Sequence, residues 1–211
     1  DVFIAENASG VLLGFSRLIM VNADGSGTKS LSGFQGSRSL GISQDGGDVI
    51  AFTIAAPPGK TLMPRDSVPG ADPGRRPASK AEGLGVVEID VETLRERRVE
   101  QPNRDAIRYL ADDNGSVRIM VRHPLDSLGR MGPKRFYYYR RPDSSKWEEI
   151  SEGEVDAQTR SGFVPVAVDA SSNRAYGFGT KDGYDALVAL SLDGTGKSET
   201  LLARNDVDVD Q

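Results

Sequence analysis

The stretch VAVDASSNRAYGFGTKDGYDALVALSLDGTGKSETLL, which spans Val166–Leu202, contains four strand-sized runs separated by three turn signals. The turn signals are Asp169–Asn173, Thr180–Gly183 and Asp193–Gly196. They are rich in Asp, Asn and Ser, whose short side chains bond the local backbone, and in Gly, which tolerates positive φ. Strand-length runs separated by such turns are typical of consecutive hairpins. The stretch therefore predicts one complete four-stranded antiparallel meander.

Looser copies of this unit recur upstream. Gly41–Phe52 and Tyr109–Met120 each hold a short strand, an Asp-containing turn and a second strand. The outer half of the unit recurs in Leu18–Lys29, Val86–Thr93 and Phe136–Ser145. The repeat is about 50 to 70 residues long, which exceeds a minimal propeller blade because insertions follow the second strand. The sequence predicts an all-β chain, a β-propeller of four-stranded antiparallel blades.

The repeats divide the chain into blades. We expect an incomplete blade at 1–35, a blade at 36–101 with an inserted loop 57–83, a blade at 102–155 with an inserted loop 123–133, a blade at 156–204, and a lead into the next blade at 205–211. The first inserted loop is predicted from its prolines, which cannot donate to a sheet ladder. Because each blade needs neighbours on both faces, this partial arc of about three to four blades should belong to a larger ring. The missing strand and the next blade would come from sequence outside 1–211.

Composition narrows the class of protein. A formal net charge of −5 with interleaved signs argues against a nucleic-acid surface or an anionic membrane as partner. The absence of cysteine excludes disulfides, thiol nucleophiles and thiolate metal sites. No run approaches the ~20 apolar residues of a membrane span. Little helix is expected, and Glu92–Val99, its best candidate, fits a hairpin equally well.

Two short motifs resemble ligand sites. Gly196-Lys197-Ser198 matches the end of a phosphate-binding loop, but Ser191 stands where that loop has its first glycine. Asp206, Asp208 and Asp210 match the start of a calcium loop without its glycine and distal glutamate. We interpret the first as a strand-to-strand turn and the second as an acidic edge, and we assign no cofactor-binding or metal-ligating residue.

Three other features favour a structural interpretation. His123, the only histidine, lies in a Pro/Gly-rich insertion and is expected to be exposed and without a role. Phe136–Tyr139 and Trp147 are expected to pack in the core and across strands rather than to form a ligand platform. Arg95–Arg98 is expected to be a solvated strand face.

The repeat motifs resemble a known family. Ser43–Gly46 followed by Ile50–Phe52 is similar to the Ser-Pro-Asp-Gly…Ile-Ala-Phe signature of TolB-like, WD40-like propeller repeats, with Gln44 in place of proline. Val188–Gly196 looks like the outer strand and turn of that repeat. The chain as a whole resembles the N-terminal propeller region of bacterial prolyl-oligopeptidase-family (S9) serine peptidases. The resemblance implies a propeller that covers a C-terminal α/β-hydrolase domain and restricts access of large substrates to its Ser-Asp-His triad.

The catalytic motifs of this peptidase family are not found in the sequence. A hydrolase of this type needs a Gly-x-Ser-x-Gly elbow, which is absent, and a histidine base, for which only His123 is present. No catalytic residue is therefore assigned, and the triad is expected beyond Gln211. Glu148-Glu149 resembles the glutamate pair with which dipeptidyl peptidases of this family hold a substrate amine, but in a strand the two side chains point to opposite faces.

Two functions follow from the resemblance. In the first, the chain is the non-catalytic propeller part of an S9-type peptidase, with its own C-terminal α/β-hydrolase domain and a peptide substrate as partners. The resemblance then favours a periplasmic or secreted location. In the second, the chain is a TolB-like binding module that recruits a protein partner and has no enzymatic activity.

Overall fold

A computed structural model describes residues 2–6, 12–16, 19–20, 24–27, 29–30, 59–67, 82–90, 92–128, 130–154 and 161–209. Over these residues the chain consists of strands, turns and irregular segments without any helix, so the all-β prediction is confirmed. Accordingly, the described segments include no helix that could span a membrane. The chain forms two compact units, the first made of Asp1–Thr53 with Gly59–Asn103 and the second of Ile54–Pro58 with Arg104–Gln211.

The described residues of the first unit form three small antiparallel sheets. The first sheet pairs β1 (Val2–Glu6) with β2 (Leu12–Ser16), the second pairs β3 (Ile19–Met20) with β4 (Lys29–Ser30), and the third has the order β5 (Lys60–Ser67), β6 (Gly83–Asp90), β7 (Glu96–Asn103). The central strand β6 is buried along nearly its whole length. A small core forms where Met63 of β5 packs with Val87 and Ile89 of β6.

Strand β5 corrects the prediction of an inserted loop over 57–83, because Lys60–Ser67 is a strand. Its Leu62 and Met63 are buried, so this segment holds more apolar packing than its prolines suggested. Pro64 lies in the ladder opposite Val86. β5 is an edge strand of the described sheet, the position at which sheets accommodate proline. The rest of the predicted loop, 68–81, and the predicted strand pair Gly41–Phe52 lie outside the described residues.

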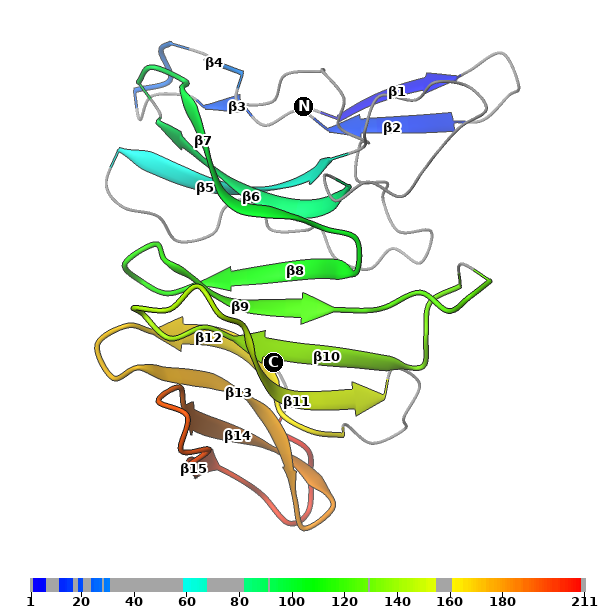
Figure 1. The fold of residues 1–211 in the computed structure, drawn as a ribbon, viewed down its shortest axis with the longest axis vertical. Coiled ribbons are helices and arrows are strands. Elements are labelled where there is room, and N and C mark those ends of the chain that lie inside the picture. The colour runs from blue at the N-terminus through cyan, green and yellow to red at the C-terminus, as the bar shows by residue number, and fades with distance from the viewer. Residues whose placement is uncertain are drawn as a thin grey trace. The chain divides into compact units, whose positions relative to one another are not determined.

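The second unit contains two four-stranded antiparallel meanders (Figure 1). The first meander consists of β8 (Ala106–Ala111), β9 (Val117–Arg122), β10 (Lys134–Tyr139) and β11 (Glu148–Glu154); the second consists of β12 (Val164–Asp169), β13 (Arg174–Lys181), β14 (Tyr184–Ser191) and β15 (Ser198–Leu202). In each meander, every strand pairs with the next along the chain. The four strands and three turns predicted in Val166–Leu202 are thus confirmed, and no described sheet closes on itself.

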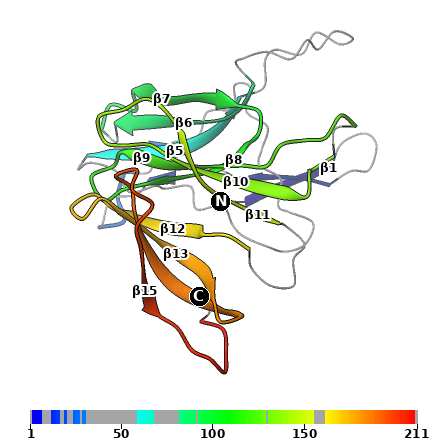
Figure 2. The same cartoon turned by 60° about the horizontal axis from the view of Figure 1, so that its bottom comes forward.

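The two meanders pack against each other through alternating side chains. Ile119, Val121, Tyr137 and Tyr139 of the first sheet meet Val168, Ala175 and Leu192 of the second in one buried cluster. The first strands of the two sheets, β8 and β12, also lie side by side, and Asp112 and Val168 form a parallel bridge at their ends. In the turned view β12 lies next to the first meander, whereas β15 lies well away from it (Figure 2). The first strands β8 and β12 therefore take part in the contact between the sheets, together with side chains of β9 and β10.

The outer strand β15 is irregular. Leu202 pairs with Leu187, and Thr200 pairs with Val188, so Leu201 is the extra residue of a β-bulge. All five side chains of β15 are exposed. This strand contributes hydrogen bonds to the sheet but no buried side chain.

The packing between the meanders predicts that Ile119→Ala lowers the free energy of unfolding by about 2–5 kcal/mol, because Ile119 is fully buried in β9 and its loss leaves a cavity. Denaturant unfolding of the wild type and the variant measures the change. Leu202→Ala serves as a control at an exposed position and should change stability by no more than about 0.5 kcal/mol. Equal losses for the two variants would contradict the described core.

Candidate functional site

Aspartates organise many of the tight turns. Each carboxylate accepts a hydrogen bond from the backbone N–H two residues further on; the aspartates are Asp24, Asp90, Asp112, Asp126, Asp169 and Asp193. This is the Asx-turn interaction, which explains why Asp begins these turns. Hydrogen bonds from neighbouring hydroxyl and backbone groups lower the pKa of Asp193 and of Asp169. These carboxylates are therefore structural.

Asp193 shows the effect most strongly. The Thr195 hydroxyl donates to Asp193 Oδ1 at 2.6 Å, and the Thr195 backbone N–H donates to the same oxygen at 2.8 Å. Both bonds favour the ionised carboxylate and lower the pKa of Asp193 to about 2. The charge stabilises the turn between β14 and β15.

The clearest polar cluster lies where turns of the two meanders meet. We call it the intersheet cluster and define it as Asp112, Arg118, Asn173 and the backbone carbonyl of Arg140. The Arg118 guanidinium uses all three of its nitrogens there: Nε donates to Arg140 O at 2.7 Å, Nη1 to Asp112 Oδ2 at 3.3 Å and Nη2 to Asn173 Oδ1 at 2.6 Å. The side chains of Arg118 and Asp112 are only 2% and 4% exposed. Three of the five N–H donors of the Arg118 guanidinium are thus used within the cluster, one on each nitrogen.

Local turn geometry positions the members of the cluster. Asp112 Oδ1 accepts the N–H groups of Asn114 and Ser116, which fixes its carboxylate at the end of β8. Asn173 adopts a left-handed conformation with φ +51°, which Asn tolerates better than most residues. Its backbone carbonyl accepts the Leu192 N–H at 2.9 Å, so the residue is held from both sides.

A second bond joins the same turns. The backbone N–H of Ala170 donates to Asp113 Oδ1 at 2.7 Å, so successive meanders are tied turn to turn. Nearby, Arg141 bonds Glu148 at 3.1 Å and lies over the β14–β15 turn. At Gly194, with φ +89°, an added Cβ would lie 2.2 Å from Arg141 Nη2. That turn requires glycine for both its conformation and its contact with the first meander.

The Glu148 side chain forms hydrogen bonds with Tyr139 and Arg141. Glu148 and Glu149 lie on β11, as predicted, and Tyr139 Oη donates to Glu148 Oε2 at 3.1 Å. Together with Arg141, this bond uses the carboxylate internally. The pair therefore lacks the arrangement that would hold a substrate amine.

His123 is buried, so the prediction of an exposed histidine is wrong. The side chain is 6% exposed, and the 123–133 segment pairs with itself through an antiparallel bridge between Leu125 and Met131. Its Nε2 lies 2.6 Å from the carbonyl oxygen of Gly132. The contact links the two ends of the insertion, and it joins the ring to a backbone carbonyl rather than to a nucleophilic hydroxyl.

The two ligand-like motifs have structural partners. Gly196-Lys197-Ser198 belongs to the antiparallel turn between β14 and β15, in which the Ser191 N–H donates to Lys197 O at 2.8 Å. Asp206 bonds Arg204, and Asp208 accepts the Asp185 N–H at 2.8 Å. Asp210 lies outside the described residues. Among the residues that the structure describes, no group of three or more His, Asp or Glu side chains could hold a metal ion.

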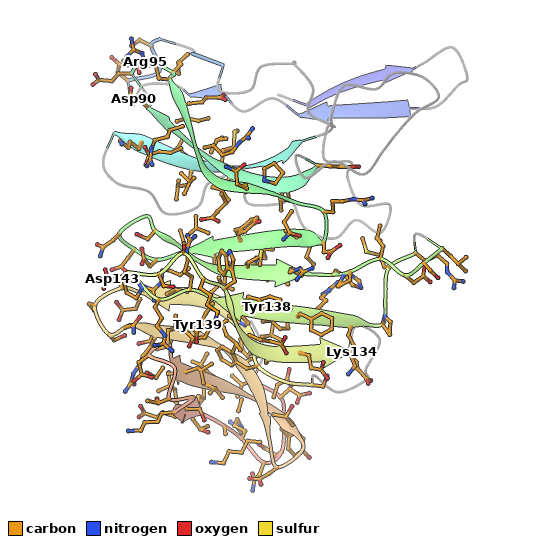
Figure 3. All side chains as sticks on the ribbon, in the orientation of Figure 1. Asp90, Arg95, Lys134, Tyr138, Tyr139 and Asp143 are labelled. Carbon is orange, nitrogen blue, oxygen red and sulfur yellow. The ribbon has the colours of Figure 1, made fainter. Side chains whose placement is uncertain are left out.

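The aromatic residues pack as predicted. Tyr137 and Tyr139 lie in the apolar cluster between the two meanders. Tyr138, next to Tyr139 on β10 (Figure 3), packs against Arg122, whose guanidinium carbon lies 5.5 Å from the ring centroid. Trp147, directly before β11, packs under Arg140 at 4.7 Å. These contacts form cross-strand packing, and the stacking cations already cover the rings.

The arginine-rich segment Arg95–Arg98 is exposed, as expected. Sequence reasoning missed the partner of Arg97. Glu88, on the neighbouring strand β6, is mostly buried and pairs with Arg97 at 3.1 Å and Lys60 at 2.8 Å. These hydrogen bonds, first from Arg97 and then from Lys60, lower the pKa of Glu88. Glu88 and Arg97 are cross-strand partners in the β6–β7 ladder, so opposite charges on the two strands were the signal that could have indicated this pair.

No protein-family model matches the sequence, and no curated protein is significantly similar to it. The described residues thus define the class of protein by fold alone. They form an all-β protein in which consecutive antiparallel meanders pack through an apolar cluster, their first strands and a buried arginine cluster.

The intersheet cluster predicts that Arg118→Met lowers the free energy of unfolding by about 3–5 kcal/mol. The substitution keeps the side chain's bulk but leaves the buried Asp112 carboxylate without its counter-charge and Asn173 without its donor. Thermal and denaturant unfolding measure the loss. Arg174→Met is the matched control, because the Arg174–Glu199 pair is exposed and should contribute less than about 1 kcal/mol. Similar losses in the free energy of unfolding for both variants would show that the buried cluster stabilises the fold no more than an exposed ion pair does.

Asp193 predicts a pH dependence of stability. Its pKa is about 2 in the folded chain against 3.8 for an ordinary aspartate, so the folded state favours the ionised form. The resulting stabilisation is fully present above about pH 5 and is lost as the pH falls through 3.8 toward 2. The stability difference between wild type and Asp193→Asn should therefore shrink over this range and stay constant above pH 5. An NMR titration that places the Asp193 carboxyl at 3.8 would contradict this assignment.

Proposed function

We propose that residues 1–211 are the non-catalytic propeller part of an S9-type serine peptidase, which controls the access of oligopeptides to a C-terminal α/β-hydrolase domain. The observation that carries the proposal is the parallel contact between β8 and β12, the first strands of successive meanders. In a propeller the first strands of neighbouring blades lie side by side around the central channel. Two successive meanders whose first strands lie side by side fit this arrangement.

The two faces of the β8–β11 sheet support the same architecture. Ile119 and Val121 point toward the β12–β15 sheet, whereas Met120 alternates to the opposite face, where Tyr109 is its cross-strand partner. All four side chains are buried. A sheet with apolar side chains on both faces needs cover on both sides, as a blade within a ring has.

The site chemistry supports a non-catalytic role. His123 bonds a backbone carbonyl, and each nitrogen of the Arg118 guanidinium donates within the intersheet cluster. The partners in this proposal are the chain's own hydrolase domain and a peptide substrate, in a periplasmic or secreted location. Nucleic acid and membranes are not proposed as partners, because charges of both signs are interleaved along the chain.

The second candidate is a TolB-like propeller that recruits a protein partner and carries no enzyme. It is favoured by the exposed apolar side chains on the 123–133 insertion, since such groups mark interaction surfaces. The two candidates differ in the sequence expected beyond the propeller. A Gly-x-Ser-x-Gly elbow with a later Asp and His would favour the peptidase.

A fluorophosphonate probe tests the proposed function. We expect the protein with its full natural sequence to be labelled at a serine beyond residue 211, because only an activated serine reacts with such a probe. A fragment of residues 1–211 should remain unlabelled. Intact-mass and peptide mass spectrometry locate the adduct. A folded full-length protein that does not react would favour the binding module.

A further inference from the structure

The turn between β8 and β9 contains the only Asn-Gly dipeptide of the sequence, Asn114-Gly115. Asn114 is exposed, and its side-chain amide forms no hydrogen bond with the part of the chain that the structure describes. Glycine has no side chain to shield its backbone nitrogen, so that nitrogen can approach a neighbouring group closely. The turn therefore places a carboxamide carbon beside an unshielded backbone nitrogen.

These two groups can react with each other, because neighbours in one chain act as intramolecular reactants. The Gly115 nitrogen, after losing its proton to hydroxide, attacks Cγ of Asn114. The bond from Cγ to the side-chain nitrogen breaks, and that nitrogen takes a proton from water and leaves as ammonia, which regenerates the hydroxide. The product is a five-membered succinimide ring.

Water then opens this ring in either of two ways. Cleavage of the bond between the ring nitrogen and Cγ gives aspartate at position 114. Cleavage of the bond between the ring nitrogen and the backbone carbonyl carbon gives isoaspartate, in which the main chain runs through Cγ. The net reaction replaces the amide NH2 by OH, consumes water, releases ammonia and changes no oxidation state.

The folded turn opposes the first step. The Gly115 N–H, whose proton must leave, donates to Asp112 O at 3.0 Å. Asp112 Oδ1 accepts the N–H groups of Asn114 at 3.1 Å and Ser116 at 2.9 Å, and Arg118 holds the other carboxylate oxygen of Asp112 at 3.3 Å. Ring closure therefore requires a local opening that breaks bonds of this turn.

The same turn ties the two meanders together, because Asp113 Oδ1 accepts the Ala170 N–H at 2.7 Å. Conversion of Asn114 would place a third carboxylate directly after Asp112 and Asp113, and neighbouring like charges repel. Isoaspartate also adds a methylene to the main chain before Gly115, which changes the spacing between Asp112 and the N–H groups that it accepts. Either product weakens the turn.

We propose that Asn114 is a modification site, which deamidates when the β8–β9 turn opens and whose product weakens the contact between the two meanders. Because the reaction is irreversible under these conditions, each opening of the turn that leads to ring closure leaves a permanent mark on the chain. The proposal goes beyond the proposed function and holds for a peptidase propeller or a binding module alike.

Peptide mass spectrometry tests the site and its dependence on folding, using the protein with its full natural sequence. Folded protein and protein unfolded in urea are incubated at the same pH and temperature, and the mass gain at position 114 is followed with time. We expect deamidation to be at least about tenfold slower in the folded protein, because the turn must open first. Asn114→Gln should remove the mass gain at this position, because glutamine would have to close a larger ring. Equal rates in the folded and unfolded protein, or no modification of Asn114 in the unfolded protein, would overturn the proposal.

Asn114→Asp reproduces the aspartate product and tests its effect on the fold. Near neutral pH we expect it to raise the ratio of unfolded to folded protein about two- to fivefold, as the added charge lies beside two carboxylates. Asn205→Asp makes the same chemical change at an exposed position in the segment after β15 and should have a smaller effect. Denaturant unfolding measures both ratios. Equal effects of the two substitutions would contradict a specific weakening of the contact between the meanders.

Discussion

The packing of the second unit depends on one buried guanidinium. Arg118 leaves β9 at the point where the first meander meets the second, and its three nitrogens reach a carboxylate, an amide and a carbonyl from three different turns or strand ends. A buried cation is tolerated only when it is paired and hydrogen-bonded. The need for these partners favours one position of the second meander relative to the first, because a shift of one along the other would separate Arg118 from Asn173. Apolar packing of Ile119 and Leu192 then supplies non-directional stabilisation around a geometry that the polar contacts define.

The local part of this fold could be predicted from the sequence, and the long-range part could not. Val166–Leu202 was predictable because each turn has its own chemical signal, such as Asp193 with Thr195 or Asp169 with Ser171. The intersheet cluster has no such signal, since Arg118 and Asn173 are 55 residues apart and the spacing of two residues in sequence does not indicate their contact. Two predictions from composition were wrong: Lys60–Ser67 forms an edge strand despite its proline, and His123 is buried although its segment is rich in proline and glycine.

Several polar side chains of the second unit form hydrogen bonds within the chain. Asp193 and Asp169 organise turns, Asp112 pairs with Arg118, and Glu148 bonds Tyr139. An active site leaves reactive groups free to meet a substrate, whereas a scaffold uses them internally. These side chains therefore stabilise the turns and the contact between the two meanders. Gly196-Lys197-Ser198 is likewise part of a strand turn, as the sequence predicted, since glycine, lysine and serine serve such a turn as well as a phosphate-binding loop.

The bulge at Leu201 has a consequence for how the molecule behaves at high concentration. A regular outer strand would present an even row of N–H and C=O groups on which the strand of another molecule could template itself. The extra residue bends β15 and interrupts that row, and the negatively charged Glu199 lies on the same strand. Growth of an intermolecular sheet from this edge would require the bulge to be straightened first. The irregularity therefore protects the chain against edge-to-edge fibril formation.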